Sequence, residues 1–234
     1  FEYMGEDPYL AGKLAVPYIQ GLQSNGVAAC VKHYACNNEE RHRHKTDVEV
    51  SERALREIYL PAFEMAVKEG DAWSIMASYN LFRGTHCCHN GYLINDILKG
   101  EWGFDGLVMS DWAGTHDTKE AVLGGLDVEF GTKVGKKMPA GESVYDIYYL
   151  ANPYKEGILS GEYSMEGLDE RVRRVLRLTF KTAMNPDKPY GSMCTPEHLA
   201  VARKVAQEGI VLLKNDNDVL PLKKVRKISV VGEN

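Results

Sequence analysis

The sequence lacks several features that mark specialised classes of protein. No apolar run approaches the length of a transmembrane helix, and no basic run is long enough to indicate binding to nucleic acid. We therefore expect neither a membrane span nor a nucleic-acid partner. The chain has only 5 cysteines, two of them adjacent (Cys87 and Cys88), so we expect no disulfide framework.

The composition is that of an ordinary globular protein, with 44% hydrophobic and 26% charged residues and a net charge of -5. A length of 234 residues allows one large domain or parts of two. The Pro- and Gly-rich stretch Asn185–Gly191 marks a domain boundary. We predict a first domain over residues 1–184, a linker over 185–196 and the start of a second domain over 197–234.

The stretch from Leu107 to Trp112 carries the most informative pattern. Leu107–Ser110 is typical of a short buried strand, and Asp111 and Trp112 follow it directly. Asp is a poor strand residue, so Asp111 is expected at the carboxyl end of the strand, where parallel α/β folds place their chemistry. The alternative is that Asp111 caps a helix that begins near Thr115.

Two other predicted strands end in side chains that can bind or react. Val27–Val31 leads into Lys32 and His33, and Trp73–Ser78 leads into Tyr79. Helical patterns separate the strands, as in a β/α barrel whose site is built from strand ends. The predicted helices are Leu10–Gln23, Glu52–Lys68 with a bend or a split at Pro61, Gly91–Lys99, Glu142–Leu159 and Met165–Ala183.

The number of predicted strands is too small for a complete barrel. Only four candidates precede the boundary, the fourth being Leu126–Phe130, whereas an eight-fold barrel takes roughly 250 residues. Beyond the boundary we expect a helix after Thr195 and a strand over Lys227–Val231. The fold class is therefore α/β, a partial TIM-like barrel followed by the first elements of another α/β domain, and the chain is expected to be an interior piece of a larger protein.

A series of collinear motifs resembles the glycoside hydrolase family 3 enzymes, the β-glucosidase and β-xylosidase group. The motifs are Phe1–Glu2, Glu6–Leu10, Val31–Ala35, Asn37–Asn38, Ser51–Leu60, Met76–Asn80, Glu101–Gly106, Met109–Trp112, Glu208–Asn215 and Leu220–Leu222. The resemblance implies a β/α barrel followed by an α/β sandwich domain. It is compatible with a periplasmic or secreted enzyme, and the chemistry needs no cofactor or metal.

The resemblance also implies residue roles. Asp111 matches the nucleophile of a retaining mechanism, which forms a covalent glycosyl-enzyme. A nucleophilic carboxylate must stay ionised and needs donors nearby. The matching substrate-binding residues are Lys32 and His33, which hold sugar hydroxyls; Tyr79, which approaches the nucleophile; Met76 and Trp112, which form apolar walls; and Arg43, which lies in the polar loop Asn37–Asp47.

The general acid/base that the resemblance implies is a Glu of the second domain, beyond Asn234. Glu39, Glu40 and Glu129 do not match it, so we expect the 234 residues alone to be inactive or nearly so. The Ser110–Trp112 form resembles that of β-glucosidases, which predicts exo-acting release of β-glucose from oligosaccharides or aryl glucosides. The alternatives are a β-xylosidase, a Schiff-base lyase that uses Lys32, and a non-catalytic sugar-binding relic. His86–His89 invites a metal-site interpretation, but packing is expected instead.

Overall fold

The computed structural model describes residues 3–131, 141 and 143–232. The chain divides into two compact units, Phe1–Pro189 and Tyr190–Asn234. The division falls inside the predicted linker, and the limits of complete domains remain a prediction. No helix in the described ranges is both long enough and apolar enough to span a membrane.

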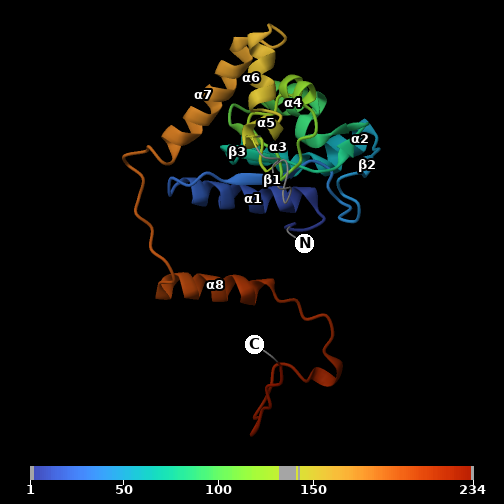
Figure 1. The fold of residues 1–234 in the computed structure, drawn as a ribbon. Helices are drawn as coiled ribbons and strands as arrows, with labels where there is room; N and C mark the ends of the chain where they lie inside the picture. The colour runs from blue at the N-terminus through green and yellow to red at the C-terminus, as the bar shows by residue number, and fades with distance from the viewer. Residues whose placement is uncertain (1–2, 132–140, 142, 233–234) are drawn as a thin grey trace. The chain divides into compact units, whose positions relative to one another are not determined.

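The first unit is built on three parallel strands in the order β1-β3-β6, of which Figure 1 labels β1 and β3. The three strands are Cys30–Tyr34, Ser74–Ala77 and Leu107–Met109. Helical segments connect them, as in consecutive units of a β/α barrel, so the predicted α/β fold with a partial barrel is confirmed. A short parallel bridge from Met109 to Val128 extends the sheet beyond β6.

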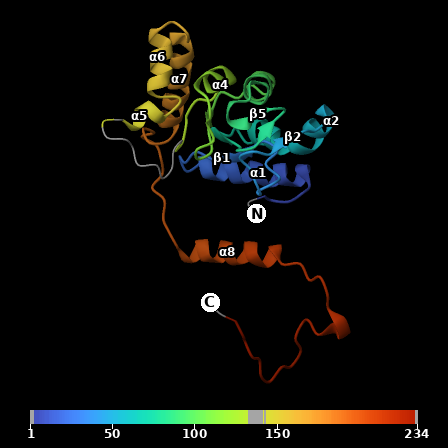
Figure 2. The ribbon, with the colours of Figure 1, turned by 45° about the vertical axis from the view of Figure 1, so that its right-hand side comes forward.

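Helices surround this sheet, and a small second sheet lies beside it. The helical segments of the first unit are α1 Pro8–Gln23, α2 Glu52–Ala54, η1 Leu55–Tyr59, α3 Pro61–Lys68, η2 Cys87–His89, η3 Tyr92–Glu101, α4 Thr118–Gly124, α5 Val144–Ile147, α6 Asn152–Leu159 and α7 Met165–Lys181. The second sheet has the strand order β2-β4-β5, formed by Asp47–Val48, Leu81–Phe82 and Thr85–His86. Figure 2 shows α1 running beneath β1 and the pair α6 and α7 standing at one end of the unit.

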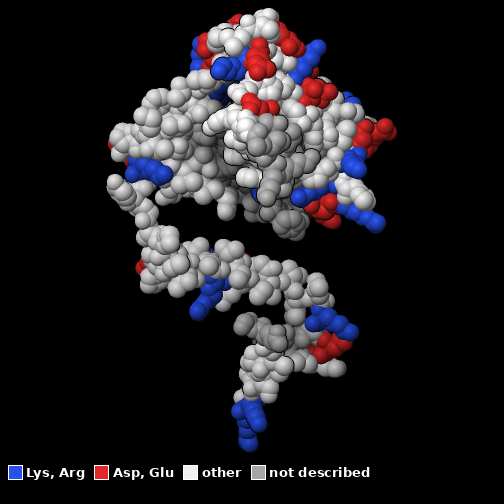
Figure 3. Space-filling view, viewed as in Figure 1, with Lys and Arg blue, Asp and Glu red and all other residues white. Residues whose placement is uncertain are grey.

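The main hydrophobic core lies between the sheet and its helices. Ile75 and Val108 from neighbouring strands are fully buried in it, together with Ile94 and Ile97 of η3. Burial of such apolar side chains stabilises the unit by about 1.5–3 kcal/mol each. The surface of the first unit is rich in charged side chains, unlike the core. Figure 3 shows acidic and basic side chains next to one another there, in agreement with exposed ion pairs such as that of Arg53 with Glu57.

Several predicted elements differ from those observed. The first strand lies further along the chain, so Lys32 and His33 stand within β1 rather than after it. The predicted helix Glu52–Lys68 is divided at Leu60, which agrees with the bend or split predicted at Pro61, because Pro61 provides no backbone N–H and begins α3. Leu126–Phe130 contributes only the bridge at Val128.

The prediction of one continuous helix over Glu142–Leu159 was also wrong. The first residue of that range lies outside the described residues, and the remainder forms α5 and α6 with extended backbone at Tyr148 between them. Pro153 explains the new start, since proline favours the first turn of a helix.

The second unit contains α8, Pro196–Gly209, and the short helix η4, Asp216–Asp218. Thr195 caps α8 as predicted, with its hydroxyl accepting from His198 N at 3.3 Å. The strand predicted over Lys227–Val231 is not formed among the described residues. A strand needs a partner for its backbone N–H and C=O groups, and none is paired with it there.

Candidate active site

Asp111 stands immediately beyond the carboxyl end of β6. Hydrogen bonds to the neighbouring segment hold this turn, since Ser110 N donates to Val128 O at 2.9 Å and Phe130 N donates to the Ser110 side-chain Oγ at 2.9 Å. The Asp111 carboxylate accepts from Trp112 N at 2.6 Å and its side chain is 14% exposed. The capping alternative was wrong, because α4 begins at Thr118 and Asp117 is its cap.

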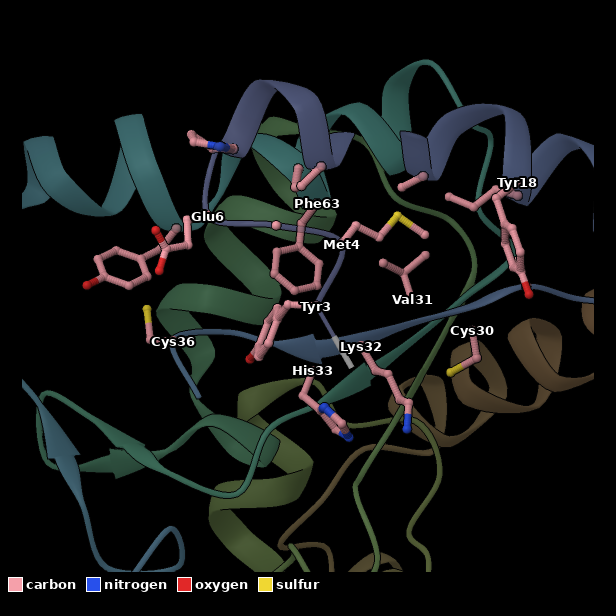
Figure 4. A pocket seen from close by; sticks show the side chains of 18 of the residues that line it. Tyr3, Met4, Glu6, Tyr18, Cys30, Val31, Lys32, His33, Cys36 and Phe63 are labelled. Carbon is pink, nitrogen blue, oxygen red and sulfur yellow. The ribbon is translucent and has the colours of Figure 1, made fainter. Parts of the chain in front are cut away.

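Strand β1 brings a histidine to this carboxylate. The His33 Nε2 atom lies 3.3 Å from Asp111 Oδ2. In Figure 4 the side chains of Lys32 and His33 both project to the side of β1 opposite Phe63. The pairing register of β1 with β3 shifts between Val31 and Tyr34, so the usual alternation of side chains is interrupted there. Both polar side chains can therefore serve the same site.

Tyr79 and Arg43 extend the site beyond the strands. Burial, followed by the negative charge and the hydrogen bond of Asp111, raises the pKa of Tyr79 to about 12. Tyr79 is thus a neutral hydrogen-bond donor to Asp111 at ordinary pH. The Arg43 guanidinium lies 4.5 Å from the centre of the Tyr79 ring, a cation–π distance.

These residues line an open cavity of about 180 Å³. Its lining residues are Tyr3, Lys32, His33, Asn37, Glu40, Arg43, Tyr79 and Asp111. Five of the seven predicted site residues therefore meet around one space. Carboxylate, amide, ammonium and guanidinium groups supply the hydrogen-bonding capacity that a neutral, hydroxyl-rich ligand requires.

Three lining residues were missed from the sequence. Asn37 and Glu40 lie in the same polar loop as the predicted site residue Arg43, but nothing in the aperiodic sequence of that loop distinguishes them from their neighbours. Tyr3 gave no signal either, since it precedes the first helix. Its hydroxyl donates to Asn37 O at 2.7 Å, which ties the segment before α1 to the polar loop.

Met76 and Trp112 lie elsewhere than on the described lining of this cavity. Met76 pairs with Met109 in the register of β3 and β6. The Trp112 indole is 57% exposed and stacks on Phe130, with ring centres 6.4 Å apart and planes at 12°. An exposed indole beside a carboxylate offers a flat apolar surface next to the cavity.

A second, larger hollow of about 640 Å³ lies between α1, β1 and α3. Its lining is mostly apolar, as Figure 4 shows for Met4, Val31 and Phe63, and it shares Tyr3, Lys32 and His33 with the smaller cavity. It lacks Asp111 among its lining residues. The smaller cavity is therefore the candidate site, because the reactive carboxylate faces it.

The histidines near the site pack against one another. The His86 and His116 rings lie 4.0 Å apart, and burial lowers the pKa of His89 and of His116 to about 4. His89 Nδ1 lies 2.9 Å from Glu120 Oε2, although the contact is not aligned for a hydrogen bond. Within the described residues, no group of three or more His, Cys, Asp or Glu side chains could hold a metal ion.

Comparison with known proteins gives a consistent group of relatives. Beta-glucosidase BoGH3A of Bacteroides ovatus is 54% identical over the whole chain, which spans 32% of that protein. An exo-alpha-(1->6)-L-arabinopyranosidase of Bifidobacterium longum is 39% identical, and the chain spans 30% of it. The structure of a beta-glucosidase from Kluyveromyces marxianus in complex with glucose matches with a TM-score of 0.82 and 40% identity, over 95% of this chain and 26% of that one.

The chain therefore spans about a third or less of the length of these relatives. Residues 2–178 match the model of the glycosyl hydrolase family 3 N-terminal domain. This match covers well over half of the chain, and it includes every residue that was predicted for the site. The chain belongs to glycoside hydrolase family 3.

Proposed function

We propose that the complete protein carrying this chain is a retaining, exo-acting glycoside hydrolase that releases β-D-glucose from the non-reducing end of β-glucosides. The observation that carries the proposal is the Asp111 carboxylate, which faces an open cavity beside His33 and Tyr79. The names of the relatives support a glycosidase, and most of those named above are beta-glucosidases.

In the proposed first step, an Asp111 carboxylate oxygen attacks the anomeric carbon and the glycosidic bond breaks. The leaving oxygen takes a proton from a general acid, which gives a covalent glycosyl-enzyme. In the second step, water attacks the same carbon, transfers a proton to the base and restores the Asp111 carboxylate. Two inversions at one carbon give net retention of configuration.

The described residues suggest how the first step is organised. Trp112 N and the Tyr79 hydroxyl donate to Asp111, which fixes the direction of its free lone pairs. Lys32, His33 and Arg43 supply donors to the hydroxyls of the sugar. The general acid is expected from a segment outside these 234 residues, and we therefore expect the isolated chain to be inactive or nearly so.

The test is covalent trapping in the complete protein. An activated 2-deoxy-2-fluoro-β-glucoside slows the second step, so the labelled peptide identifies the nucleophile by mass spectrometry. We expect the label on Asp111 and hydrolysis of aryl glucosides by the unlabelled enzyme. A protein that cleaves glucosides but carries no label on Asp111 would contradict the assignment.

A second candidate substrate is a pentopyranoside. One relative is named an arabinopyranosidase, and β-xylosidases were an alternative from the sequence. Aryl β-glucoside, β-xyloside and α-L-arabinopyranoside turnover, compared as kcat/KM in one preparation, separates these substrates. The β-glucoside is expected to be the best of the three.

A further inference from the structure

The cavity contains a second carboxylate that the proposed mechanism does not use. Glu40 lies in the polar loop after β1, and its side chain lines the cavity together with Asp111. Its Oε2 atom accepts from Arg43 Nη1 at 2.8 Å, and its Oε1 atom accepts from Asn37 Nδ2 at 3.2 Å. Both oxygens of the carboxylate therefore accept hydrogen bonds from other residues that line the cavity.

The adjacent Glu39 has the same side chain and a different environment. Its carboxylate accepts from Arg41 N at 2.8 Å, which is a contact inside the loop, and it is not among the residues that line the cavity. Of the two neighbouring glutamates, Glu40 contacts residues of the cavity, whereas Glu39 makes a contact within the loop. Glu39 provides a matched control for any experiment on Glu40.

The partner of Glu40 is itself placed over a site residue. Arg43 lies against the face of the Tyr79 ring, and Tyr79 in turn interacts with Asp111. Glu40, Arg43, Tyr79 and Asp111 therefore form one continuous series of contacts along the cavity. Within the described residues, Arg43 is paired with Glu40, and Asp111 is paired with His33.

This ion pair contributes little to stability. The Arg43 and Glu40 side chains are 38% and 54% exposed, and pairs of that kind stabilise a fold by about 0–1 kcal/mol. An arginine carries several rotatable bonds, and an ionic partner restricts the orientation of its planar guanidinium group. The effect of Glu40 should consequently appear in ligand binding rather than in unfolding.

We infer that Glu40 is a positioning residue, which holds the Arg43 guanidinium in the orientation that donates to the hydroxyls of a pyranoside in the cavity. The inference rests on the proposed function, because it assigns Arg43 to substrate. Glu40 is an acceptor here, since donors on Arg43 and Asn37 occupy both of its oxygens. A proton donor at this position would need one oxygen free to carry the proton towards the leaving group.

The test is a double-mutant cycle in the complete protein with an aryl β-glucoside. Glu40→Ala should raise KM about 10-fold and change kcat less than about 3-fold, because binding is lost rather than transition-state chemistry. In the Arg43→Ala background, the same substitution should change KM less than about 2-fold, since its target is gone. Glu39→Ala should leave both constants near those of the wild type.

Glu40→Gln provides a conservative variant that retains one carbonyl acceptor for Arg43, and it should recover part of the lost affinity. It also carries the test if Glu40→Ala does not fold, which thermal unfolding would reveal. Additive effects of the Glu40 and Arg43 substitutions would overturn the inference, because they would mean direct contact between Glu40 and substrate. A large fall in kcat with loss of one limb of the pH profile would overturn it as well.

The failure of this inference can be distinguished from failure of the proposed function. A wild-type protein without glycosidase turnover overturns both. An active wild type that Asp111 labelling confirms, in which Glu39→Ala and Glu40→Ala behave alike, overturns only the positioning role.

Discussion

Two carboxylates, one near each end of strand β6, differ in how many of their hydrogen-bonding positions the protein occupies. Near the amino end, Asp127 has a side chain that is 2% exposed and accepts from Val108 N and Lys99 Nζ, both at 2.8 Å. Beyond the carboxyl end, Asp111 is paired with His33 at 3.3 Å and faces a cavity. One carboxylate is saturated by the protein, and the other retains capacity for a ligand.

Around Asp127, largely buried charged side chains connect neighbouring elements of the fold. Lys99 also donates to Gly125 O at 2.7 Å, and Arg174 of α7 donates to Gly106 O at 2.8 Å. These contacts connect α7 and η3 to the start of β6. In barrels of this type, interactions at that end stabilise the fold while the opposite end carries the chemistry. The comparison therefore predicts separable effects on activity and on stability.

The largest effect is expected at the carboxyl end. Asp111→Gly should lower kcat in the complete protein at least about 10³-fold, because the covalent step loses its nucleophile, and thermal unfolding should remain close to that of the wild type. Added azide should restore turnover and give a glycosyl azide of inverted configuration, which NMR identifies. Retained turnover without azide would mean that another group attacks the anomeric carbon.

The next effect is expected at the amino end. Asp127→Asn leaves the Lys99 ammonium buried without its ionic partner, so the free energy of unfolding should fall by about 3–5 kcal/mol in urea titrations. The fraction that remains folded should keep its KM. Asp105→Asn is the control, since that exposed carboxylate pairs with Arg177 at 3.6 Å and should change stability by less than about 1 kcal/mol. Equal losses in the two variants would remove the distinction.

A smaller effect is expected at Glu129, which lies two residues beyond Asp127. Its Oε2 atom accepts from Leu150 N at 2.8 Å, its Oε1 atom is buried without a partner, and burial raises its pKa to about 7 from the usual 4.5. A raised pKa means that the folded state prefers the neutral acid. Stability from this group is full below pH 4.5 and is lost as the pH rises through 7.

Glu129→Gln keeps an acceptor for Leu150 and remains neutral. The free energy of unfolding of this variant should therefore not decrease as the pH rises through 7. The difference from the wild type between pH 5 and pH 8 should reach at most about 3 kcal/mol. Urea unfolding at the two pH values measures it, with Glu156→Gln on α6 as an exposed control. A wild type that is equally stable at both values would contradict the buried-acid interpretation.

The meeting of Asp111, Lys32, His33 and Tyr79 was predictable because parallel strands align their carboxyl ends. The contributions of Asn37 and Glu40 were not, since an aperiodic polar loop has no pattern that fixes its path. Its conformation depends on contacts between side chains, such as Glu40 with Arg43, that only the folded chain brings together.

The break between α5 and α6 was a different kind of error. The apolar spacing over Glu142–Leu159 predicts one helix, but Pro153 has no N–H to donate to the carbonyl four residues before it, so the helix is interrupted ahead of this proline. The strand over Lys227–Val231 failed for a third reason, because strand formation depends on a partner as well as on local composition.

The hollow between α1, β1 and α3 is lined mostly by apolar side chains such as Met4, Val31 and Phe63. Apolar surface of this kind associates with other apolar surface in water, because its burial is favourable. Molecules of the isolated polypeptide would therefore tend to associate through this hollow. Aggregation that grows with concentration is the practical consequence, and filling the hollow is the condition for keeping the polypeptide dispersed.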